Sequence, residues 1–175
     1  MARARAPLLV LIGGIIALAG IACAATPEEQ VLTRFFEASR ALDSTALSRL
    51  ATVTFNPRID GSIQLFSIED RSPEQRVSAT DQERDAATRS LSAATGEEVD
   101  FASAAVDIVT RQVTLKADVR SPEGVVAPGV FNVTLRRAIA IQKNGATIEG
   151  RWIVTRLQRA PDARTSRAAS SVPRS

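Results

Sequence analysis

The stretch at residues 26–50, TPEEQVLTRFFEASRALDSTALSRL, decides the fold because it predicts two consecutive helices that share an apolar side. Thr26 precedes a proline and has a glutamate three residues later, which is the pattern of a capped helix start. Apolar side chains then recur three and four residues apart, so one face of the first helix is expected to pack inward. The expected inward residues are Val31, Leu32, Phe35, Phe36, Ser39 and Leu42, and the charged residues expected on the other side are Glu28, Arg34, Glu37 and Arg40.

Two further helix starts follow. Asp43 predicts the N-cap of a short second helix over 44–52. A second capping box at residues 80–83 opens a longer helix, which is expected to stop before Gly96. The apolar face of this helix is thin, mostly alanine with Leu91, so the helix is expected to be partly exposed.

The rest of the chain alternates between apolar and polar side chains, which is the pattern of strands that bury one face. The clearest case is 111–120, where the odd-numbered side chains are mostly apolar and the even-numbered ones are polar. An Asn-Gly pair at residues 144–145 predicts a hairpin turn, since such turns favour positive φ. Strands are predicted at 62–70, with Ile63, Leu65 and Ile68 inward, at 99–110, at 111–120, at 129–141, and at 150–158, with Trp152, Val154 and Arg156 on one face.

This order of elements resembles the nuclear transport factor 2-like superfamily, with its cystatin-like α+β cone. The residues that carry the resemblance are 31–50 at the start, with GVFNVTLRR (129–137) and GRWIVTRLQ (150–158) near the end. The resemblance implies an α+β fold in which N-terminal helices pack on a curved antiparallel sheet and leave a conical pocket. It does not fix a function, because the fold hosts enzymes, binding modules and scaffolds. The candidates to line a pocket for an apolar ligand, or else to form ordinary core, are Phe35, Phe36, Phe66, Phe131 and Trp152.

A single hydrophobic helix is expected to precede this domain. Residues 6–25 carry no charge and, as a helix, would span about 30 Å, the thickness of a bilayer core. Two arginines precede them, which favours a cytoplasmic N-terminus and an exported domain. Three fates remain open: retention as a membrane anchor, cleavage as a signal peptide after the small-x-small triplet 22–24, or lipidation at Cys23.

The sequence around Cys23 resembles a bacterial lipobox but has Gly20 where leucine is usual. The tail is rich in Ser, Ala, Arg and Pro without periodicity, so it is expected to be disordered. The expected parts are a signal or anchor segment at 1–25, a nuclear transport factor 2-like domain at 26–160, and a disordered tail at 161–175.

The residue types present narrow the chemistry. The chain has no histidine, no tyrosine and one cysteine, which excludes a histidine base, a tyrosine acid, an internal disulfide and a cysteine-rich metal site. No catalytic residue, metal ligand or cofactor motif is assigned. Arg136 and Arg137 could contact an anion, but neighbouring strand residues point to opposite faces. Carboxylates considered as a base, by resemblance to the ketosteroid-isomerase-like and polyketide-cyclase-like enzymes of the superfamily, are Asp60, Asp107 and Asp118.

These observations favour a non-catalytic domain and leave three functions open. Basic and acidic side chains nearly balance within 26–160, so no nucleic-acid partner is expected. The leading hypothesis is a bacterial envelope protein, bound to the membrane through 6–25, whose exported domain binds a protein partner or a small apolar ligand. It would be secreted or lipid-anchored if processed. The alternatives are a scaffold subunit of an envelope or secretion assembly, similar to type IV secretion components, and a carboxylate-only isomerase or cyclase-like enzyme.

Overall fold

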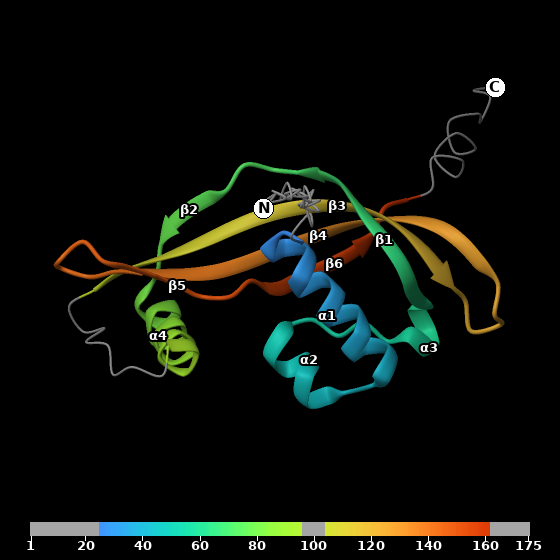
Figure 1. The fold of residues 1–175 in the computed structure, drawn as a ribbon, viewed down its shortest axis with the longest axis horizontal. Helices are drawn as coiled ribbons and strands as arrows, with labels where there is room; N and C mark the ends of the chain where they lie inside the picture. Colours follow the sequence, from blue (N-terminus) through green and yellow to red (C-terminus); the bar gives the residue numbers. More distant parts are fainter. Residues whose placement is uncertain (1–24, 96–103, 162–175) are drawn as a thin grey trace, which may run out of the picture.

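The computed structural model describes residues 25–95 and 104–161 of the chain. Helices come first and a curled antiparallel sheet follows, so the expected α+β class is confirmed. The hydrophobic helix expected at 6–25, Cys23 and the tail beyond Pro161 lie outside these residues. The elements are α1 (Pro27–Ala41), α2 (Ser44–Leu50), α3 (Pro57–Asp60), β1 (Ser62–Arg71), β2 (Gln75–Ser78), α4 (Asp81–Thr95), β3 (Ala105–Arg120), β4 (Val126–Ile141), β5 (Thr147–Glu149) and β6 (Ile153–Arg159) (Figure 1). No helix in the described segments is both long and apolar enough to cross a membrane.

Strands β3 and β4 form a hairpin that runs the length of the molecule (Figure 1). They pair from Ala105 opposite Ile141 to Arg120 opposite Val126. The structure therefore joins the two strands expected at 99–110 and 111–120 into one, as far as the first of them is described. Strands β1 and β2 pair with β3, and strands β5 and β6 pair with β4. The three- and four-residue strands β5 and β2 were not predicted.

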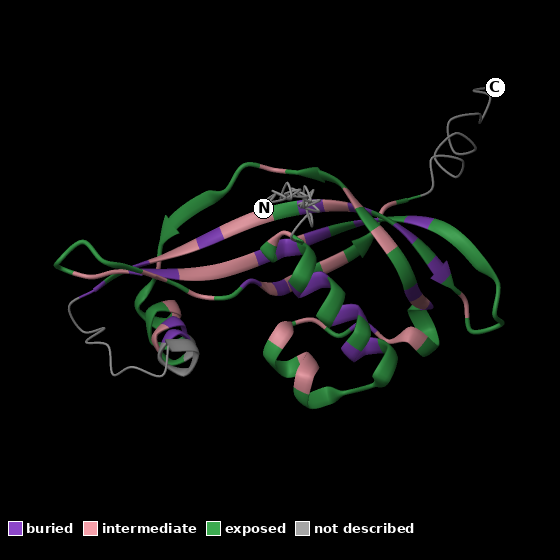
Figure 2. Ribbon diagram, in the orientation of Figure 1, coloured by how far each residue is buried: buried purple, intermediate pink, exposed green. Residues whose placement is uncertain are grey.

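The two faces of the hairpin pack against different helices, because side chains alternate along a strand. Odd-numbered residues such as Val113 and Leu135 face α1 and form the main core. Even-numbered residues where β3 begins and β4 ends, such as Val106 and Ala140, join Leu91 of α4 in a smaller cluster. Long strand pairs twist, and in Figure 1 both helices lie below the hairpin. Figure 2 shows buried positions along the hairpin and α1.

In the region from α1 to β1, three side chains lie on the opposite side from the one their periodicity predicts. Glu28, expected to be exposed, is only 4% exposed because it pairs with Arg111. Leu42, expected inward, is 51% exposed because it ends α1 in the left-handed conformation, with φ of 55°. Leu65 is 70% exposed because a register shift just before it turns the strand over, and Phe66 packs against the core instead.

A second register shift, between β4 and β6, inverts the last half of β6. Trp152 and Val154 are buried as expected, whereas Arg156 is exposed and Leu157 packs against the main core. The backbone N–H of Thr52 donates to the carbonyl oxygen of Val154 at 2.9 Å. This bond ties the loop after α2 to the edge of the sheet.

Candidate ligand-binding cleft

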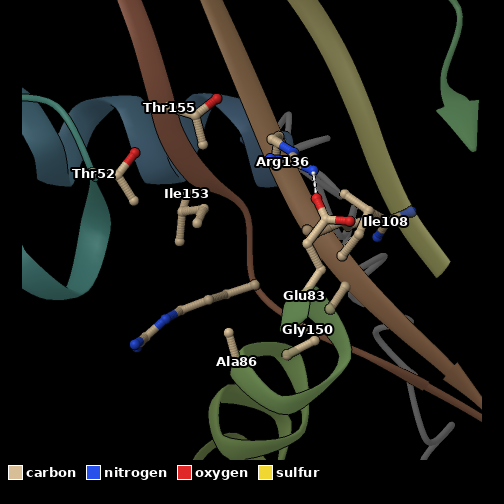
Figure 3. A pocket seen from close by; sticks show the side chains of 12 residues that line it. Thr52, Glu83, Ala86, Ile108, Arg136, Gly150, Ile153 and Thr155 are labelled. Carbon is tan, nitrogen blue, oxygen red and sulfur yellow. Dashed lines mark hydrogen bonds and ion pairs between the residues drawn. The ribbon is translucent and has the colours of Figure 1, made fainter. Parts of the chain in front are cut away.

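A cleft of about 420 Å³ lies between α4 and the sheet. Its floor is formed by apolar side chains of the sheet, α4 forms one wall, and the loop after α2 contributes to the other. Figure 3 shows Thr52 and Ile153 on one side of the cleft, with Glu83 and Ala86 of α4 across from them. The lining residues are Thr52, Glu83, Ala86, Ala87, Ile108, Arg136, Arg137, Ala138, Gly150, Arg151, Ile153 and Thr155.

The cleft exists because the side chains of α4 that face the sheet are short. Ala86 and Ala87 both line the cleft, and neither reaches far enough to fill it. Leu91, one turn further along, is fully buried and packs closely on the sheet. A Cβ at Gly150 would lie 3.2 Å from Leu91 Cδ2 and 3.0 Å from the carbonyl oxygen of Ala138. The absence of a side chain at Gly150 therefore lets Leu91 approach the sheet, while the alanines leave a gap beside it.

Glu83 ties the start of α4 to the sheet across the cleft. Its Oε2 accepts hydrogen bonds from the backbone N–H and the hydroxyl of Thr80, at 3.1 and 2.9 Å, and the Glu83 N–H donates to Thr80 Oγ1 at 3.3 Å. The predicted capping box is therefore confirmed. The other carboxylate oxygen of Glu83, Oε1, accepts a hydrogen bond from Arg136 Nη2 at 2.8 Å (Figure 3). The hydrogen bond from Arg136, with those from Thr80, lowers the pKa of Glu83 to about 2, so this carboxylate is ionised at neutral pH.

Arg137 belongs to a charged cluster on the face of the sheet that α1 covers. Its guanidinium carbon lies 4.7 Å from the ring centroid of Trp152, and that of Arg111 lies 5.8 Å from the same centroid. Both arginines thus contact the ring as cations over an aromatic surface. The carboxylates that pair with the two guanidinium groups come from three parts of the chain and are Glu28, Glu74 and Glu149. The cluster holds one more carboxylate than guanidinium groups, and it joins the start of α1 to the sheet.

The lining contains three arginines, and two of them, Arg136 and Arg137, form ion pairs with carboxylates. Arg151 is the third and differs from them. It is exposed, and within residues 25–95 and 104–161 it makes no ion pair or side-chain hydrogen bond. Its neighbours in the chain are held in place: the Gly150 N–H donates to the carbonyl oxygen of Ala138 at 2.8 Å, and Trp152 is 4% exposed. The cleft therefore has a guanidinium group without a carboxylate partner on a fixed piece of backbone.

The five aromatic residues proposed from the sequence lie in and around the main core and do not line this cleft. Phe36 makes edge-to-face contacts with three neighbouring rings, at centroid distances of 5.2, 6.1 and 5.5 Å. Phe35 and Phe131 are buried in the same core. Phe66 and Trp152 each line a separate hollow, of about 340 and 170 Å³. A ligand-binding role for these five residues stays a prediction.

The three carboxylates considered as a catalytic base do not line the cleft. Asp60 accepts a hydrogen bond from the Asn56 N–H at 2.9 Å and is exposed. Asp107 pairs with Arg76 at 3.8 Å, and Asp118 is exposed on the outer face of the sheet. In the described part of the chain, no group of three or more His, Cys, Asp or Glu side chains is arranged to hold a metal ion.

Comparison of the chain with protein-family models, with curated proteins and with solved structures found no match. Sequence reasoning missed the cleft, although two of its signals were visible: the thin alanine face of α4 and the adjacent pair Arg136 and Arg137, both of which line the cleft. The missing information was which part of the sheet α4 covers.

Proposed function

We propose that this chain is an envelope protein whose exported domain is a non-catalytic binding module for a small apolar ligand, held in the cleft beside α4. The cleft itself carries the proposal. Its volume of about 420 Å³ falls within the range of about 300–1,000 Å³ that is usual for small-molecule sites. Its apolar floor, with polar and charged side chains around it, is a combination that such sites use to hold and orient a ligand.

The charged groups of the cleft support binding rather than catalysis. A general base works best when its pKa lies near the operating pH, whereas the pKa of Glu83 is lowered to about 2. The remaining charged groups of the lining are arginines, which do not lose their protons in proteins. The cleft therefore offers hydrogen bonds and fixed charge but no group suited to proton transfer at neutral pH.

The proposal keeps the membrane setting predicted from the sequence. Residues 6–25 would hold the protein in the membrane, with the N-terminus in the cytoplasm and the domain exported. Helix α1 begins at Pro27, so a retained anchor would keep the domain close to the bilayer. We also propose membership of the nuclear transport factor 2-like superfamily, which the order of helices and the curled antiparallel sheet support.

The test is a calorimetric titration of the full chain with 1-octanol, a neutral apolar probe. The chain is purified in a fluorinated surfactant, because such surfactants mix poorly with hydrocarbon ligands. Saturable binding at one site is expected. Ala86→Leu places a larger side chain in the cleft and is expected to weaken binding at least tenfold (roughly 1.4 kcal/mol or more).

The matched control is Ala41→Leu, the same substitution at an exposed position at the end of α1. It should leave octanol binding unchanged. The proposal is wrong if wild-type protein shows no saturable binding of either octanol or octanoate, or if Ala86→Leu and Ala41→Leu bind octanol equally well.

A further inference from the structure

The charges that line the cleft do not cancel. Glu83 is neutralised by Arg136, with which it shares a hydrogen bond of 2.8 Å. Arg137 is neutralised by the glutamates of the charged cluster around Trp152. Arg151 has no carboxylate partner within the described residues, so the lining carries an excess positive charge at this one position.

The setting of Arg151 favours an anion that also has an apolar part. The apolar floor, formed by Ile108, Ala138 and Ile153, excludes water from one side of a bound ligand. A charge-assisted hydrogen bond is stronger beside such a surface than in bulk water. Arg151 follows Gly150, whose N–H donates to the carbonyl oxygen of Ala138 in β4, so the Cα of Arg151 is held beside the cleft and only its side chain has to be ordered on binding.

A hydroxyl group adds a second polar contact within the cleft. The hydroxyl of Thr52 makes no hydrogen bond to any other described residue. Figure 3 shows Thr52 facing the cleft from the side opposite α4. The Thr52 backbone is held by its bond to Val154, so this hydroxyl is available to a ligand at a defined place.

We infer that the ligand of this cleft is an amphipathic monoanion, a carboxylic acid with an apolar body, whose carboxylate pairs with Arg151. The inference rests on the proposed function and adds the charge of the ligand to it. The apolar body lies on the floor formed by the sheet, as a neutral ligand would. The carboxylate accepts hydrogen bonds from the Arg151 guanidinium, an arrangement that suits the planar geometry of both groups.

The test compares two probes of equal chain length, octanoate and 1-octanol, in the same calorimetric titration of the full chain at pH 7. Octanoate is expected to bind about tenfold more tightly, because a hydrogen bond to a charged group stabilises a complex by about that factor. Arg151→Gln is expected to remove this preference and to leave octanol binding within about twofold of wild type. Arg151→Lys, which keeps the charge and loses the planar guanidinium group, is expected to retain only part of the preference.

Arg156→Gln is the matched control. Arg156 lies on β6, which begins just after Arg151, and it is exposed and does not line the cleft. The control variant should bind both probes as wild type does. Higher salt should weaken the binding of octanoate and not that of octanol. Equal affinities for the two probes would overturn the inference and leave the proposed function standing, as would a preference that survives Arg151→Gln. Absence of saturable binding for both probes would remove the proposed function itself.

Discussion

Helices α1 and α4 start alike and end in different surroundings. Each has 15 residues, and each is capped by a threonine that accepts a hydrogen bond from the third residue after it. Helix α1 then presents leucine and phenylalanine to the sheet and buries them completely, whereas α4 presents alanines and a single leucine. The volume of these side chains decides the difference. Large side chains fill the space between a helix and the sheet, whereas short ones leave part of it empty. One helix therefore closes a core, and the other leaves a cleft.

The two helices also differ in how a glutamate of the first turn ties them to the sheet. The Glu28 side chain is 6% exposed where it meets Arg111, while the side chains of Glu83 and Arg136 are 39% and 40% exposed. Removing one partner of a buried pair leaves an uncompensated charge, whereas exposed pairs contribute little. The attachment of α1 is thus part of the core, and that of α4 is close to solvent.

Phe36→Ala is expected to have the largest effect on this comparison. Phe36 is 2% exposed and contacts three other rings, so its truncation should lower the free energy of unfolding by about 3–5 kcal/mol. Urea unfolding followed by the fluorescence of Trp152, the single tryptophan, measures this change. Leu65→Ala, at a 70% exposed position, is the control and should change stability by less than about 0.5 kcal/mol. Similar losses for both variants would contradict the assignment of the core.

Leu91→Ala should have a smaller and more local effect. We expect a loss of about 2–3 kcal/mol, at the low end for such truncations, because the adjoining cleft gives the site room to relax. Hydrogen exchange should accelerate in α4 and stay slow in α1, since the two helices belong to separate clusters. Arg89→Ala, an exposed change on the same helix, should leave exchange unaltered. Equal acceleration in both helices would show that the clusters unfold as one unit.

Leu42→Gly should sharpen the comparison by stabilising α1 further. Leu42 ends the helix with φ of 55°, and its N–H and that of Asp43 donate to the carbonyl oxygens of Ser39 and Ala38. Glycine adopts this conformation without the steric cost that leucine carries, and the exposed leucine side chain has little packing to lose. A gain of about 1 kcal/mol is expected in urea unfolding. A loss of stability would mean that the Leu42 side chain has packing that matters.

Glu83→Gln should have the smallest effect, and one that depends on pH. The folded protein lowers the pKa of Glu83 from 4.5 to about 2, so its stabilising contribution is complete above about pH 4.5 and is lost as the pH falls to about 2. The difference in urea midpoint between wild type and Glu83→Gln should therefore shrink across this window. Glu37→Gln, at an exposed position of α1, should show a constant offset from wild type. A constant offset for Glu83→Gln as well would contradict the ionic contact with Arg136.

Local signals were enough to predict α1, α2, α4 and the main strands, although the four-residue helix α3 was not predicted. Capping at Thr26, Asp43 and Thr80 depends on hydrogen bonds within a few residues, so the pattern and the structure agree. The alternation in 111–120 likewise identifies the buried face of β3, because period two is set by the strand itself. The errors arose where long-range pairing intervenes. A register shift exposes Leu65, and Glu28 is buried by an arginine 83 residues away in the chain.

The candidate site could not be predicted in this way. Its residues come from the loop after α2, from α4, from β3, β4 and β6, and from the segment between β5 and β6, and nothing in their spacing brings them together. Phenylalanine and tryptophan attracted attention as pocket residues because they are large and apolar. The same property makes them fill the space under α1, so the cleft lies where side chains are small.

The sequence by itself determined where helices begin, which face of α1 and β3 is apolar, and which chemistry is excluded by the absence of histidine and tyrosine. These properties follow from local hydrogen bonding, side-chain periodicity and residue type. Only the tertiary structure decided that α1 and α4 cover opposite faces of one hairpin, that Glu28 is buried, and that Arg151 borders a cleft without a carboxylate partner in the described chain. The reason is that strand register and twist bring together residues far apart in sequence, and local patterns carry no information about either.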